Sequence, residues 1–64
     1  MRSPLPVDAR IALAATLARR GEIAVAAELG ASPLTVRRAR DGARLNPTTI
    51  YALTAYLREE ALAA

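Results

Sequence analysis

The sequence predicts an all-α fold of four helices in a single domain. Glycines and prolines divide the chain at intervals that suit short helices, and the segments between them carry apolar residues at helical spacing. No segment alternates apolar and polar residues as a half-buried strand would. At 64 residues the chain has room for one modest core. We expect a flexible N-terminal arm over residues 1–6, where Pro4 and Pro6 block a helix, and one domain over residues 7–64.

The first two helices are expected on either side of Gly21. The first runs from Val7 to about Arg20, and the second covers residues 22–29 and ends at Gly30, a residue suited to a left-handed helix end. The inward stripe expected in the first helix is Ile11, Ala14 or Ala15, and Ala18, flanked by Leu13 and Leu17. The inward residues expected in the second are Ile23, Ala26, Ala27 and Leu29.

The remaining two helices are predicted from a Ser-Pro pair and an Asn-Pro pair. Ser32 suits an N-cap and Pro33 a first helical position, so a third helix is expected over residues 33–41, ending at Gly42. Asn46 and Pro47 repeat this signal and predict a fourth helix over residues 47–64. Its expected inward stripe is Ile50, Leu53, Leu57 and Ala61.

The composition argues against an enzyme. The chain has no cysteine and no histidine, which removes disulfides, thiolate nucleophiles, imidazole bases and the usual zinc ligand sets. The six acidic residues show no paired spacing that suggests acid/base catalysis. We therefore expect no catalytic residues, no metal, no cofactor and no small-molecule ligand.

Positive charge is concentrated in one stretch of the chain. Residues 32–44 carry four arginines against Asp41, whereas the rest of the chain carries five arginines and five acidic residues. Every basic residue is an arginine. A local basic excess of this kind is the electrostatic footprint expected for a surface that binds phosphate.

The segment from Glu22 to Gly42 resembles the helix-turn-helix of the lambda-repressor-like family. The matching positions are a small residue where the two helices touch, a turn glycine, a branched core residue and a closing glycine: Ala26, Gly30, Val36 and Gly42. With one helix before and one after, the resemblance covers about residues 7–60. It implies a four-helix domain in which two short helices cross steeply and the second enters the DNA major groove.

The resemblance also implies roles for individual residues. On the helix over residues 33–41, Val36, Ala39 and Ala43 should face the body, and Leu34, Arg37, Arg38 and Asp41 should face outward. The expected base-reading residues are Leu34, Thr35, Arg37 and Arg38. The expected contacts to the DNA backbone are Ser32, Arg44, Asn46 and Thr48. Arg40 is expected to form a salt bridge with Glu59 or Glu60.

Two residues depart from the family pattern. Glu22 stands where the family often has a glutamine that approaches a phosphate, so this carboxylate either points away or weakens binding. Ala39 is smaller than the usual residue at its position, and we expect Tyr51 or a leucine of the fourth helix to fill the space.

The predicted function is a sequence-specific double-stranded DNA-binding regulator, similar to a Cro-like repressor of a phage or plasmid. Such a protein acts on an inverted-repeat operator as a homodimer, for which we expect an interface on helix 47–64 around Tyr56, Leu57 and Leu62. The alternative is an antitoxin or phage-encoded protein-interaction module that reuses the fold. RNA binding is disfavoured, because two tyrosines are a poor stacking platform. No stretch has the length of a membrane span, so a cytoplasmic location is expected.

Overall fold

A computed structural model describes residues 1–63 of the chain, so Ala64, the last residue of the expected domain and fourth helix, lies outside the described residues. Residues 1–63 form four helices and one two-stranded ribbon, and none of these helices has the length and apolarity that crossing a membrane requires. The elements in order are β1 (Ser3–Pro4), α1 (Val7–Arg20), α2 (Glu22–Leu29), α3 (Pro33–Arg40), β2 (Arg44–Leu45) and α4 (Pro47–Ala63). The all-α prediction is therefore confirmed.

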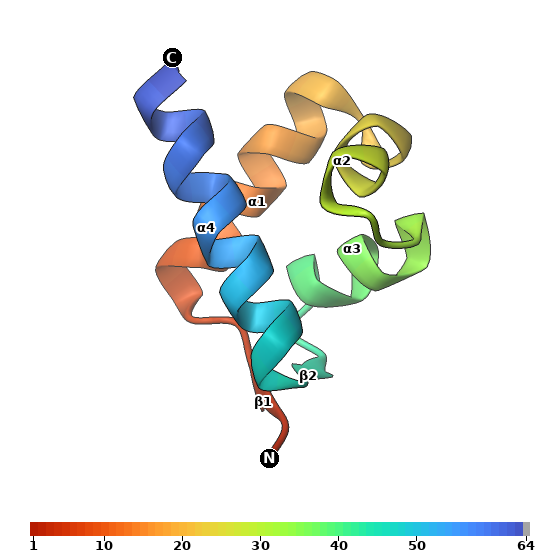
Figure 1. The fold of residues 1–64 in the computed structure, drawn as a ribbon, viewed down its shortest axis with the longest axis vertical. Helices are drawn as coiled ribbons and strands as arrows, with labels where there is room; N and C mark the ends of the chain where they lie inside the picture. The colour runs from red at the N-terminus through yellow and green to blue at the C-terminus, as the bar shows by residue number, and fades with distance from the viewer. Residues whose placement is uncertain (64) are drawn as a thin grey trace.

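The turn between α2 and α3 is built as the sequence predicts. Gly30 ends α2 with a φ of 72°, a left-handed conformation that a Cβ would strain. Ser32 caps α3 by accepting a hydrogen bond from the Thr35 amide at 3.1 Å, and Pro33 follows at the first helical position. In Figure 1, α3 runs across the view while α2 is seen almost end-on, as the predicted steep crossing requires.

One apolar cluster joins the four helices, β2 and Leu5, the residue that follows β1. The buried apolar residues are Leu5, Leu13, Leu17, Val25, Ala26, Val36, Ala39, Leu45 and Leu53. Leu53 of α4 belongs to this cluster, whereas Tyr51 is 77% exposed, so a leucine of the fourth helix and not Tyr51 packs in the core around Ala39. Ile50 and Leu57 pack partly against the cluster, but Ala61 is exposed.

The inward face of α1 differs from the expected one. Leu13, Thr16 and Leu17 are buried, whereas Ile11 is 65% exposed and the expected alanines beside it face solvent. The reason is that α1 is apolar on two faces, and the face with the two leucines buries more apolar area than one isoleucine with alanines. The buried Thr16 hydroxyl donates to the Ala12 carbonyl at 2.9 Å, which satisfies its polar atom.

A similar exchange occurs in α2. Val25 and Ala26 are buried, and Leu29 packs partly against the core. Ile23 is 78% exposed and Ala27 also faces solvent, so both were wrongly expected to face inward. The short helix can bury only the stripe that faces α1 and α3, and these two residues lie outside it.

The N-terminal segment is docked on the body, where a flexible arm was expected. β1 pairs antiparallel with β2, with Ser3 opposite Leu45 and Pro4 opposite Arg44. Leu5 is 1% exposed, and its carbonyl accepts a hydrogen bond from Arg10 Nε at 3.0 Å. Pairing across some 40 residues leaves no local pattern in so short a strand, so the sequence did not predict it.

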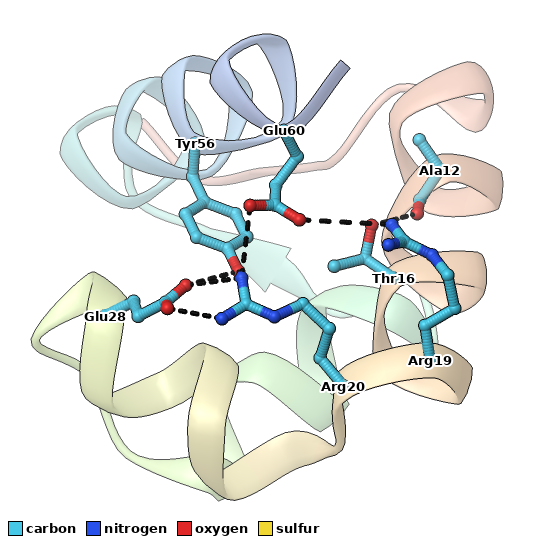
Figure 2. A network of polar contacts seen from close by, with 7 residues as sticks. All are labelled: Ala12, Thr16, Arg19, Arg20, Glu28, Tyr56 and Glu60. Atoms are coloured by element: carbon cyan, nitrogen blue, oxygen red, sulfur yellow. Dashed lines mark hydrogen bonds and ion pairs between the residues drawn. The ribbon is translucent and has the colours of Figure 1, made fainter. Parts of the chain in front are cut away.

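A polar network joins α1, α2 and α4 (Figure 2). Arg20 of α1 forms an ion pair with Glu28 of α2, donates to Tyr56 Oη at 2.7 Å and contacts Glu60 Oε2 at 3.1 Å. Tyr56 in turn donates to Glu28 Oε1 at 2.8 Å. Glu60 pairs with Arg19 and Arg20, whereas Arg40, for which Glu59 or Glu60 was predicted, pairs with Glu22 and Asp41 within the described residues.

Candidate functional site

The two faces of α3 are divided as predicted. Val36 and Ala39 are fully buried, whereas Leu34 is 50% exposed and Arg37 and Arg38 are exposed. Asp41 follows the helix and is also exposed. The domain therefore presents one face of α3 to solvent, with an apolar residue at its start and arginines along it.

The side chains of Ser32 and Thr35 at the start of α3 are used in capping the helix. Ser32 Oγ lies 2.9 Å from Thr35 Oγ1 and also accepts from the Thr35 amide. The two hydroxyls are therefore partners of each other, and Thr35 is only partly exposed. A base contact by Thr35 would use its methyl group, as the sequence analysis expected, or would have to rearrange the cap.

Arg37 is held by a carboxylate. Its guanidinium donates to Glu22 through Nη2 at 2.9 Å and through Nε at 3.3 Å. This hydrogen bond is the main reason that the pKa of Glu22 lies below its ordinary value, and the pKa of Arg37 is raised in return. The Glu22 side chain thus points along α3 and neutralises one of the two outward arginines.

Arg40 belongs to the same cluster, contrary to the expected bridge with Glu59 or Glu60. Its Nη1 lies 3.4 Å from Glu22 Oε2, and its Nε donates to Asp41 Oδ1 at 3.0 Å. The C-terminal half of α4 instead contacts α1 and α2, through the ion pair of Arg20 with Glu60 and the hydrogen bond from Tyr56 to Glu28.

A basic cavity lies beside Arg38. We call it the arginine hollow: it has a volume of about 170 Å³ and is lined by Arg2, Arg38 and Arg44 together with Thr35, Asn46 and Thr49. Within residues 1–63 none of these three arginines forms an ion pair, in contrast to Arg37 and Arg40. Three arginines that have no ion pair within the described residues thus line one concavity.

The expected backbone contacts divide between the hollow and its surroundings. Arg44 and Asn46 line the hollow, and Asn46 Oδ1 also caps α4 by accepting from the Thr49 amide at 2.8 Å. Thr48 instead lines an adjoining cleft of about 230 Å³ between the α2–α3 turn and α4. No charged residue lines that cleft, and Ser32 lies outside both concavities.

Arg2 and Thr49 are members of the hollow that the sequence analysis did not select. Thr49 follows the selected Thr48 in the first turn of α4, three residues after the expected cap Asn46, so its position in the sequence could have indicated it. Arg2 offered none, because its place depends on the pairing of β1 with β2.

Comparisons with known proteins add no relative to this description. No family model, no curated protein and no solved structure matches the chain.

Proposed function

We propose that the chain is a sequence-specific double-stranded DNA-binding regulator with a lambda-repressor-like helix-turn-helix fold. The observation that carries the proposal is the exposed face of α3, where Leu34 is half exposed and Arg38 has no acidic partner within residues 1–63. A B-form major groove admits one helix, and an arginine can donate two hydrogen bonds to guanine. The helix order and the tight turn at Gly30 agree with the family resemblance.

In this proposal the outward arginines of α3 have unequal roles. Arg38 reads a base edge, and Leu34 with the Thr35 methyl packs on a thymine methyl. Arg37 reaches a base only when it leaves Glu22, so it contributes less than its position on the helix suggests. Arg44 and Asn46 contact phosphates, and Ser32 and Thr48 lie at helix starts near the same backbone.

The regulator is proposed to bind an inverted-repeat operator as a homodimer and to exclude polymerase from it. Within α4, Tyr56 and Leu57 are engaged inside the protomer, which leaves Leu62, at 83% exposure, and Tyr51 as the large apolar residues offered to a second copy. Of the three residues expected at an α4 interface, Leu62 is thus the one with an exposed side chain.

One observation favours the alternative of an antitoxin or phage-encoded protein-interaction module. The outer face of α1 exposes Val7 and Ile11, at 59% and 65%, next to exposed alanines. An apolar helix face of this kind suits contact with another protein. The DNA proposal requires binding to random duplex that weakens steeply with salt, whereas the interaction module does not.

Selection of bound sites from a random duplex pool tests the proposed function. The protein should enrich a common motif, and Arg38→Ala should weaken binding to the selected site by about ten-fold or more, a cost of ~1–3 kcal/mol for one lost guanine contact. The melting temperature should stay the same, because Arg38 is exposed and unpaired. Failure to enrich any motif would refute sequence-specific binding, and an equal loss on selected and random duplexes would refute base reading by Arg38.

A further inference from the structure

We propose that the arginine hollow binds a phosphodiester group of the duplex backbone and that Arg2, from the N-terminal segment, is one of its donors. The inference rests on the proposed function and adds to it a site and a residue outside the helix-turn-helix.

The ribbon places Arg2 and Arg44 on one side of the domain. Pro4 lies opposite Arg44 in the antiparallel pair, and residues two apart on a strand share a face. Arg2 therefore projects from the same face as Arg44, and both line the hollow. Burial of Leu5 and the hydrogen bond from Arg10 to its carbonyl hold this strand in place.

The positive charge of the arginine hollow favours binding of an anion. Arg2 precedes β1, Arg38 belongs to α3 and Arg44 to β2, and no carboxylate is among the residues that line the hollow. Like charges brought together in this way repel each other, and an anion between them removes the repulsion. The volume of about 170 Å³ exceeds by far the ~10–15 Å³ that one water requires.

The polar groups of the hollow suit phosphate oxygens. A guanidinium matches a phosphate with paired, charge-assisted hydrogen bonds. The Oδ1 atom of Asn46 is used for the cap of α4, which leaves its NH₂ group to donate. The Thr49 side chain adds a hydroxyl at the start of the helix, where the backbone also favours negative charge.

Because the arginine hollow lies beside the outward face of α3, we expect it to bind a phosphate of the DNA duplex and not free phosphate. Arg38 lines the hollow and also stands on the outward face of α3, so a helix lying in the major groove brings the flanking backbone to the hollow. In this arrangement Arg2 binds the DNA backbone beside the bases that α3 contacts, and this contact has no sequence preference.

The test compares Arg2→Ala with Arg58→Ala, a matched control that removes the same charge from an exposed position on α4. Duplex affinity is measured as a function of salt on a selected site and on random duplex. Arg2→Ala should reduce the slope of log affinity against log salt by about 0.9, the value for one lost phosphate contact. The loss should be equal on both duplexes, and Arg58→Ala should match wild type.

A wild-type slope for Arg2→Ala would overturn the inference and leave the proposed function standing, whereas a wild-type protein that binds no duplex would overturn both. A further arm adds inorganic phosphate at an ionic strength matched with chloride. Phosphate should compete no better than chloride does. Strong competition that depends on Arg2 would identify a free anion as the occupant and would overturn the assignment to the duplex.

Discussion

Arginines at the two ends of this small domain have opposite surroundings. Where α1, α2 and α4 meet, Arg20 contacts Glu28, Tyr56 and Glu60, and its charge is used to join three helices (Figure 2). Near the ribbon, Arg2, Arg38 and Arg44 line a hollow and pair with no acid within residues 1–63. The same residue type therefore joins helices at one end and, at the other, carries charge that no acidic residue of the described chain compensates.

Between these extremes lies the cluster of Arg37 and Arg40 with Glu22. It stands next to the outward face of α3, yet its two positive charges are compensated within the domain by Glu22 and by Asp41, which pairs with Arg40. The net charge of a helix therefore does not measure how much unpaired charge its surface presents, because carboxylates outside the helix pair with some of its arginines.

The largest effect is expected from Arg20→Ala. The substitution removes the hydrogen bonds to Glu28 and Tyr56 and the ion pair with Glu60. It leaves Glu28 without a cation, whereas Arg19 still pairs with Glu60. Thermal unfolding followed by circular dichroism should show a fall in melting temperature of several degrees, larger than for alanine at any unpaired arginine. Duplex affinity measured well below the transition should not change. A melting temperature equal to that of Arg58→Ala would show that the network contributes nothing to stability.

An intermediate effect of opposite sign is expected from Glu22→Gln. The variant removes the charge that holds Arg37 and a negative charge beside the proposed DNA surface. Affinity for duplex should rise by about three- to ten-fold at low salt, and the salt slope should steepen by about one phosphate contact. Glu59→Gln is the matched control, since it removes the same charge from an exposed site on α4. Equal gains for both variants would mean that only net charge matters and that Arg37 was never restrained.

The smallest effect concerns pH. Burial, followed by the hydrogen bond to Glu28, raises the pKa of Tyr56 from 10.0 to about 12. Since the folded-state pKa lies above the unfolded one, the neutral phenol stabilises the fold below pH 10, and this contribution is lost as the pH rises toward about 12. Ultraviolet titration of Tyr51→Phe, which leaves one tyrosine, should show ionisation near pH 12. A midpoint at pH 10 would place Tyr56 outside the network.

The sequence predicted those parts of the fold that local rules determine. The cap at Ser32, the proline after it and the left-handed Gly30 set the ends of α2 and α3, and the outward face of α3 followed from helical spacing. The prediction of which α1 residues face inward was wrong. Two apolar stripes compete on that helix, and only tertiary packing decides whether Ile11 or the leucines are buried.

Contacts between distant residues account for the rest of the site. Arg37 meets Glu22 across 15 residues, and Arg2 meets the hollow only because β1 pairs with β2. Neither contact produces a residue spacing from which the sequence alone could have predicted it. The candidate helix was thus predictable, while the division of its arginines into restrained and available ones required the three-dimensional structure.

The most direct test of DNA binding through α3 and the hollow is a map of backbone amide chemical shifts during titration with duplex DNA. We predict that the largest changes fall on residues 34–38 and 44–49 and on Ser3, next to Arg2, while the amides around Arg20 and Glu60 remain nearly unchanged. Changes centred on the outer face of α1 or on the Arg20 network, or no changes at all, would contradict the account.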